Sequence, residues 1–198
     1  MELNGLLIEI LDYKDWKCTI GIAELQNEHS LSKDDFVNLA SRLVDNLLIV
    51  QFMRPDFVAG TEHLLSASQN ALNAWKGGYM ISRNLDIEVV LYTSAQRQID
   101  DALQDMGTID GLETVALVIM GESEKNVNDC ISRAQEAVGP EISPPFKLSE
   151  KRIKRVREHF GITETEIEAI TTSRDLQDRY EAVIAAVVSR VSMVALEA

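Results

Sequence analysis

The sequence predicts an α+β fold: a mixed sheet with helices packed on it and an all-helical C-terminal portion. Short apolar runs alternate with amphipathic helical patterns between residues 47 and 138, an order typical of a sheet covered by helices. Three of the four prolines gather in residues 139–146 (GPEISPPF), and every pattern after that segment is helical. Because alternating strands and helices are often joined by crossovers, we expect some connections to link parallel strands.

The first two apolar runs predict a β-hairpin. Residues 5–13 (GLLIEILDY) and 18–24 (CTIGIAE) alternate in part and are rich in isoleucine, and Lys14 and Asp15 lie between them. Ser32 and Asp35 then have the spacing of a capping box, which predicts a helix start. The continuous apolar run at residues 47–53 (LLIVQFM) predicts a buried strand.

The middle of the chain predicts three helices and two further strands. An apolar stripe repeats at helical spacing through residues 60–75, and Gly77 and Gly78 end it. Residues 87–92 (IEVVLY) form a short run rich in β-branched residues, which predicts a strand. The remaining elements are a helix over 96–106 with Ile99, Ala102, Leu103 and Met106 facing inward, a strand over 114–120 and a helix over 123–138.

The C-terminal patterns predict three helices, over residues 149–160, 163–170 and about 173–194. The second of these begins with a capping box formed by Thr163 and Glu166. We interpret the chain as a single domain over residues 1–198, because 198 residues suit one hydrophobic core. Its parts are an α/β core (1–139), a proline-rich linker (140–148) and a helical portion (149–198).

A formal net charge of −13 limits the partners that we expect. An acidic body repels phosphate backbones, which disfavours broad electrostatic binding to duplex nucleic acid and favours protein partners with basic surfaces. The first ten residues lack the pattern of a secretory signal, and the apolar runs are too short to cross a bilayer. We therefore expect a cytoplasmic protein in which Cys18 and Cys130 are reduced core thiols.

Residue spacing indicates no catalytic, cofactor or metal site, and we expect none of the three. Glycine-rich phosphate loops are absent from the sequence, and the cysteines do not have metal-ligand spacing. His63 is the one histidine beside a candidate site, and Ser66 is close enough on a helix to face it. A small hydrolase using His63 is thus an alternative, although a helix-capping or core-edge histidine is the simpler interpretation.

Residues 147–159 form the one basic run of the chain, with six cations against Glu150 and Glu158. A basic helix face often pairs with acidic neighbours inside the same protein, which is our first interpretation. A phosphate-binding or partner-binding role is the alternative. The six cations are Lys147, Lys151, Arg152, Lys154, Arg155 and Arg157.

The last helix is apolar over a wider arc than one packed face requires. A stripe of about 100° is enough to pack a helix against one layer. Here Tyr180 and a series of valines fill such a stripe, and alanines and Met193 extend it. This surplus predicts a helix that docks onto a partner, with a fully buried helix as the alternative. The expected anchors are Ile184, Val187, Val188 and Val191.

Four blocks of the sequence can be compared with known families: VAGTEHLL at 58–65, IS at 81–82, EVVLY at 88–92 and RQI at 97–99. Taken in order, they resemble the Cgi/TPRKB family, the kinase-binding accessory subunits of the KEOPS complex. The ending is also similar, with Gly161–Thr163, then Leu176–Tyr180, then an alanine- and valine-rich helix. The chain departs from the family at Thr61, where members often carry a basic residue, and at Ala95–Gln96, where they carry a Gly-Lys pair.

The resemblance implies a non-catalytic regulatory subunit that binds the small Bud-type (PRPK) kinase and, through it, the other KEOPS subunits. That complex helps to make threonylcarbamoyladenosine in tRNA. The resemblance also implies a mixed α/β sandwich with a helical C-terminal portion, which agrees with the patterns above. It implies no membrane, no cofactor and no small-molecule substrate.

Archaeal members of that family contact the single-stranded CCA end of tRNA, so the resemblance also implies a small tRNA-end site. Base stacking contributes about 1–3 kcal/mol per base and does not depend on net charge, although the two departures and the acidic body weaken the expectation. An alternative is a protein that mainly binds the tRNA 3′ end, with the kinase contact secondary. The residues expected to line the site are His63, Ile81, Arg83, Arg97 and Gln98.

Overall fold

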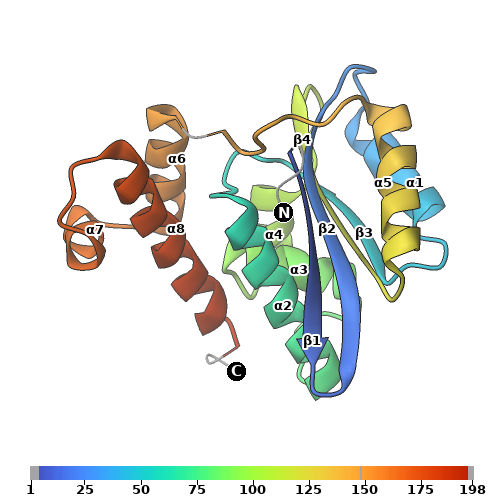
Figure 1. Cartoon of the computed structure of the whole chain (residues 1–198), viewed down its shortest axis with the longest axis horizontal. Coiled ribbons are helices and arrows are strands. Elements are labelled where there is room, and N and C mark those ends of the chain that lie inside the picture. Colours follow the sequence, from blue (N-terminus) through green and yellow to red (C-terminus); the bar gives the residue numbers. More distant parts are fainter. Residues whose placement is uncertain (1–4, 148, 196–198) are drawn as a thin grey trace.

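A four-stranded antiparallel sheet forms the centre of the molecule. The computed structural model describes residues 5–147 and 149–195 (Figure 1). The strands are β1 (Leu6–Tyr13), β2 (Trp16–Gln26), β3 (Ile49–Met53) and β4 (Thr114–Gly121), in the order β1-β2-β4-β3. The α+β class is confirmed. So is the N-terminal hairpin, in which Lys14 takes a left-handed backbone conformation at the turn (φ 54°).

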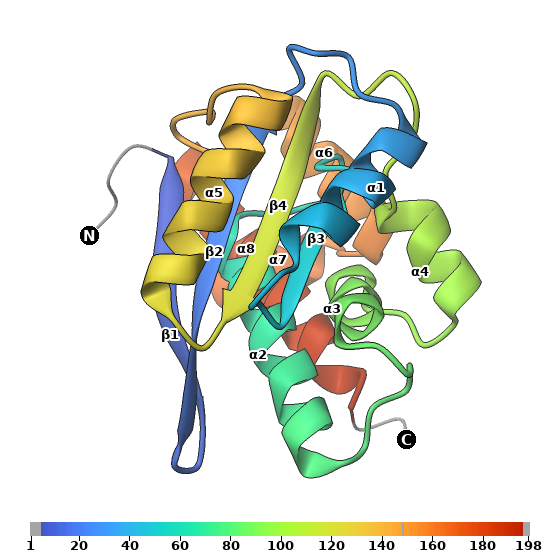
Figure 2. The ribbon, with the colours of Figure 1, turned by 90° about the vertical axis from the view of Figure 1, so that its right-hand side faces the viewer.

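Helices cover both faces of this sheet. On one face lie α1 (Lys33–Leu43) and α5 (Glu124–Val138); on the other lie α2 (Thr61–Gly77) and α3 (Leu85–Ser94), with α4 (Ile99–Met106) beside them (Figures 1 and 2). Successive side chains of a strand point to opposite faces, so one continuous apolar strand can serve two cores. In β4, Val115, Leu117 and Ile119 belong to the first core, and Ala116, Val118 and Met120 to the second.

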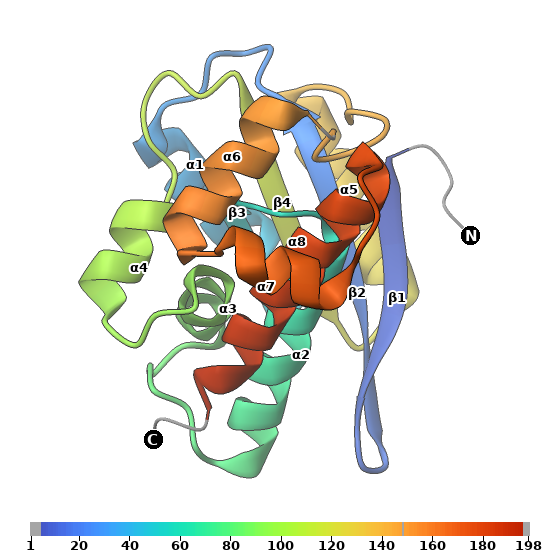
Figure 3. The same cartoon turned by 90° about the vertical axis from the view of Figure 1, so that its left-hand side faces the viewer.

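The C-terminal portion forms a further helical layer outside α2 and α3. It consists of α6 (Glu150–Phe160), α7 (Glu164–Ile170) and α8 (Leu176–Met193) (Figures 1 and 3). Buried valines of α8 share one core cluster with Leu64 of α2 and Leu91 of α3. This shared core supports the single-domain interpretation, which stays a prediction.

The start of the predicted linker is bonded to β2 rather than free of the core. Gln26 N–H donates to the Pro140 carbonyl at 2.9 Å, and Ile142 N–H donates to the Glu24 carbonyl at 2.8 Å. These bonds fix the direction in which the chain leaves α5 for α6. Leu148, at the far end of the predicted linker, lies outside the described residues.

The helix starts that depend on local signals are confirmed. Ser32 and Thr163 each accept the backbone N–H three residues on, and Asp35 and Glu166 return the bond to the cap backbone. Both are complete capping boxes. The C-terminal signal at Gly78 is confirmed as well, because this residue has φ 75° and ends α2 in the left-handed region.

Residues 87–92 are helical, so the predicted strand is wrong. They belong to α3, in which every residue from Glu88 to Ser94 is buried. A helix enclosed on all sides shows a continuous apolar run, which periodicity cannot distinguish from a buried strand. The inward orientation predicted in α4 is confirmed for Ala102 and Met106, but Ile99 and Leu103 are each 39% exposed.

The direction of the strands also differs from the expectation of a mixed sheet. All neighbouring strands in the described sheet pair antiparallel. Because residues 87–92 do not form a strand, β3 pairs directly with β4. Because β2 and β3 both run antiparallel to β4, they are parallel to each other, and α1 connects them. A parallel crossover therefore exists, with β4 inserted between its two strands, but it begins before the segment 47–138 in which the sequence predicts crossovers.

Much of the basic run on α6 pairs inside the protein, as the first interpretation predicts. Arg152 lies 3.7 Å from the buried carboxylate of Glu24 and donates to the Pro55 and Val58 carbonyls at 2.9 and 3.0 Å. Two further arginines of α6 pair with acids of neighbouring segments. These pairs are Arg155 with Asp56, and Arg157 with Glu164 at 3.1 Å.

We predict that Arg152→Ala lowers the free energy of unfolding by about 2–4 kcal/mol, because it removes the cation beside the buried Glu24 carboxylate and two hydrogen bonds to backbone carbonyls. The adjacent Lys151 is exposed, and Lys151→Ala should change stability by less than about 0.5 kcal/mol. Urea unfolding of both variants measures the difference. Equal losses in the two variants would contradict a structural role for the Arg152 contacts.

Candidate functional site

His63 is a buried structural residue rather than the wall of an open site. Its Nδ1 accepts the Ala59 N–H at 3.2 Å, so Nε2 carries the proton and donates to the Thr93 carbonyl at 2.9 Å. The ring thus ties the start of α2 to the end of α3, which confirms the core-edge interpretation. Both nitrogens have backbone partners, so neither is free to act as the general base of a hydrolase.

Ile81 lies in a loop that a buried carboxylate holds in place. Glu88 is fully buried in α3, and its two oxygens accept the N–H groups of Ile81 and Ser82 and the Ser82 hydroxyl at 2.7–3.1 Å. This role of Glu88 was not predicted from the sequence. Its signal is a glutamate inside an otherwise apolar run, because a buried carboxylate needs donors around it.

Arg83 and Arg97 lie at opposite ends of α3. This helix has 10 residues, which corresponds to a length of about 15 Å. Arg97 Nη1 donates to the Val194 carbonyl at 2.7 Å and so fastens the end of α8, whereas Arg83 is exposed. Gln98 is exposed at the N-cap of α4. The five residues expected at a tRNA end therefore do not line one pocket, because His63 is enclosed and the two arginines are apart.

The four expected anchors of α8 divide between the core and the surface. Val187 and Val191 have no exposed area, so they cannot contact a partner while the domain is folded, and their assignment as anchors is corrected. Ile184 and Val188 are partly exposed. Most of the additional apolar residues of this helix therefore pack into a core that α8 shares with α2, α3 and the helices of the C-terminal layer.

Beyond its first turns, which expose Asp178 and Glu181, the outer side of α8 is nevertheless uncharged and made of small side chains. Ala185, Val188, Ser189 and Ser192 follow one another at intervals of three, one and three residues, which places them on one face of the helix. Arg190 does not interrupt this face, because its guanidinium pairs with Glu166 of α7 at 2.9 and 3.0 Å. We call these four residues the α8 strip.

Exposed apolar side chains occur at both ends of α8 and on α7. Leu176 is 44% exposed at the start of α8, Met193 is 49% exposed at its end, and Ile170 is 50% exposed at the end of α7. Figure 3 shows α7 and α8 on the outer side of the molecule, away from the sheet. This outer layer therefore offers apolar surface around an uncharged helix face in a protein of net charge −13.

The described residues contain no cluster that could hold a metal ion and no helix long and apolar enough to cross a membrane. Cys18 and Cys130 are free and buried, as predicted. Burial raises the pKa of each thiol to about 11, so both thiols are protonated at neutral pH. Neither cysteine has the low pKa of a reactive nucleophile.

Comparison with known proteins assigns a family to most of this chain. A family model described as kinase binding protein CGI-121 matches residues 26–195, which include the sheet from the end of β2 onward, all the helices and the α8 strip. No curated protein matches the sequence.

We predict that acidification destabilises the fold through His63. Burial lowers the pKa of His63 to about 4, against an ordinary value of 6.5, so the unfolded chain takes up the proton first. The stability that depends on neutral His63 is therefore complete above pH 6.5 and is lost as the pH falls toward 4. The loss amounts to about 3 kcal/mol at most.

Urea unfolding between pH 7 and pH 4.5 measures this loss. His63→Gln, which keeps a donor for the Thr93 carbonyl, should flatten that part of the pH profile. The ring of His29 is exposed, so His29→Gln is the matched control and should leave the profile unchanged. An unchanged pH slope in His63→Gln would contradict the assignment.

Proposed function

The chain belongs to the CGI-121 family of kinase-binding proteins, and we propose that the α8 strip is the surface with which it binds its kinase. The observation that carries this proposal is the absence of charge on the strip. Exposed helix faces of acidic proteins usually carry charged residues, whereas this strip carries alanine, valine and serine. An uncharged face made of small residues lets a second helix or an apolar surface approach closely.

The charges around the strip favour a partner with a basic rim. Glu181 is exposed one turn before Ala185, and Asp178 lies one turn earlier. Acidic residues around an apolar contact steer a basic partner and add specificity more than affinity. Of the four expected anchors, Ile184 and Val188 remain partly exposed. Val188 belongs to the α8 strip, and Ile184 lies next to Ala185 at its start.

Within this proposal, the kinase is the Bud-type kinase of the KEOPS complex. The sequence blocks that resemble KEOPS subunits support this assignment, as does the family match. The protein acts there as a cytoplasmic, non-catalytic regulatory subunit in the synthesis of threonylcarbamoyladenosine. Both ring nitrogens of His63 are engaged by backbone groups, which argues against the hydrolase alternative.

The strip can be tested by co-purification with the kinase. Val188→Asp and Ala185→Asp each place a carboxylate where the partner is apolar, and each should reduce the recovered kinase at least tenfold. Ile10 is 55% exposed on β1, so Ile10→Asp is the matched control and should bind normally. Circular dichroism confirms that each variant is folded. Val191→Asp is unsuitable, because Val191 is fully buried and the change would unfold the protein. Normal kinase binding by folded Val188→Asp would refute the proposal that the α8 strip binds the kinase.

A tRNA-end role is the alternative that the family resemblance raises, and it has its own measurement. If tRNA binding were primary, a CCA-ended oligonucleotide would bind the free protein, and Arg83→Glu or Arg97→Glu would weaken that binding. Because α3 holds these arginines apart, we expect no more binding than to an oligonucleotide of the same length with a different end. Filter binding without the kinase checks this. Tighter binding of the CCA-ended oligonucleotide would favour the alternative.

A further inference from the structure

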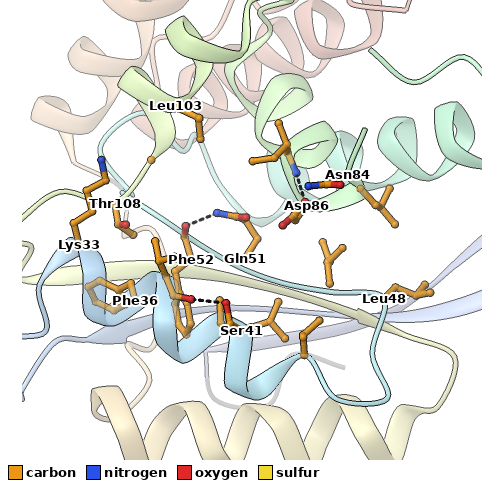
Figure 4. A pocket seen from close by; sticks show the side chains of 18 of the residues that line it. Lys33, Phe36, Ser41, Leu48, Gln51, Phe52, Asn84, Asp86, Leu103 and Thr108 are labelled. Carbon is orange, nitrogen blue, oxygen red and sulfur yellow. Dashed lines mark hydrogen bonds between the residues drawn. The ribbon is translucent and has the colours of Figure 1, made fainter. Parts of the chain in front are cut away.

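A second surface lies at the opposite edge of the sheet from β1. Figure 4 shows an open groove with α1 on one side, the first turn of α3 and Leu103 of α4 on the other, and β3 along its floor. Its volume is about 670 Å³. The exposed side of α8 takes no part in it, so the α8 strip does not account for this surface.

The floor of the groove is a strand with one unpaired edge. β3 ends the order β1-β2-β4-β3, so only one of its sides bonds to β4. On the other side, the Phe52 carbonyl accepts the Gln51 side-chain amide at 2.7 Å, and Arg54 N–H donates to the Met106 carbonyl at 3.0 Å. Backbone groups alternate along an antiparallel strand, so the N–H and carbonyl of Val50 also point into the groove.

The residues of β3 do not protect this edge. Exposed edges usually carry charges, proline or a twist that discourages further pairing, but the sequence of β3 is IVQFM. The edge is instead protected from pairing with other sheets because it lies at the bottom of the groove, between helices of both layers. A second copy of the chain would have its own β3 in the same recess, so two β3 edges cannot meet. A slender extended segment can reach the floor.

The walls provide apolar contacts on both sides of such a segment. Val37 and Val44 of α1 are 56% and 37% exposed on one wall, and Leu103 is 39% exposed on the other. Side chains of an extended segment point alternately to the two faces of the sheet it joins. Alternate residues of a bound segment would therefore meet the α1 wall and the wall formed by α3 and α4 in turn.

The charge of the lining differs in sign from that of the whole protein. Lys33 and Arg83 line the groove against a single acid, Asp86, so the lining has two cations and one anion in a chain of net charge −13. Both cations are exposed, and neither has a salt-bridge partner among the described residues. Lys33 lies at the opposite end of the groove from Asn84, the neighbour of Arg83 (Figure 4).

We propose that this groove binds an extended segment of a protein partner, which adds to β3 as a fifth strand of the sheet. The segment is apolar at alternate positions and carries an acidic residue near each end, within reach of Lys33 and Arg83. β3 has five residues, so a matching segment of five or six residues covers about 17 Å of edge. Main-chain bonds to Val50 supply affinity, and the two walls supply specificity.

A synthetic peptide tests the pairing directly. The probe is a capped octapeptide of alternating valine and threonine with a glutamate at each end, added to the isotope-labelled full chain. We expect it to slow hydrogen exchange at the Val50 amide at least tenfold. The same peptide with a central proline cannot complete the ladder and should bind at least tenfold more weakly. A version with lysine in place of glutamate should also bind more weakly, increasingly so at low salt.

Matched variants locate the site and separate it from the α8 strip. Val37→Glu should abolish peptide binding, whereas Ile10→Glu, at a residue of nearly equal exposure (55% against 56%), should not. Val188→Asp should leave peptide binding intact, and Val37→Glu should leave kinase co-purification intact. No peptide binding at millimolar concentration would overturn the proposal. So would equal binding of the proline peptide, or binding that leaves exchange at Val50 unchanged.

Discussion

The structure depends on a sheet whose two central strands are buried on both faces. β2 and β4 send alternate side chains into two separate cores, so each face needs its own cover of helices. α1 and α5 cover one face. The other needs α2 and α3, and the helices of the C-terminal layer then close the outer side of α2 and α3. This requirement explains why α8, at the end of the chain, contributes to the main core rather than standing apart as a docking arm.

The same requirement explains where surface remains for partners. Helices packed on the faces of a sheet do not cover its edges, and β3 is an edge strand between two helical layers. The groove over β3 is the gap that those layers leave. The α8 strip, in contrast, is the outer side of a helix whose inner side is in the core. Both surfaces thus follow from the layering, and they lie in different layers of the molecule.

The sequence predicts what is local and fails where the answer depends on distant neighbours. The capping boxes at Ser32 and Thr163 are correct, because every group in them lies within four residues. The strand predicted at 87–92 is wrong, because a continuous apolar run is equally typical of a helix surrounded by protein and of a strand between two layers. Glu88 was the available clue: its carboxylate is buried only because a loop six residues away supplies the donors.

The candidate site shows the same division at the level of single residues. The sequence correctly indicates that α8 has more apolar residues than one face needs, but it cannot say which valines enter the core. That choice is made by what α8 packs against: Val187 is buried while Val188, one residue on, is partly exposed. His63 gives a similar case. A capping or core-edge role could be predicted from its place at a helix start, but its partner Thr93 lies 30 residues further along the chain.

A strongly acidic surface makes its uncharged regions informative. Net charge keeps an acidic protein soluble and repels most acidic partners, so contacts are favoured where charge is absent or reversed. The α8 strip lacks charge, and the lining of the groove has more cations than acids. In the basic run of residues 147–159, Arg152, Arg155 and Arg157 pair with acids of the same chain, so the run offers a partner less positive charge than its six cations suggest. Two surfaces in separate layers, without shared residues, can be occupied independently. A subunit with this arrangement can hold a kinase on one side and an extended segment of a second protein on the other, and so bring the two together.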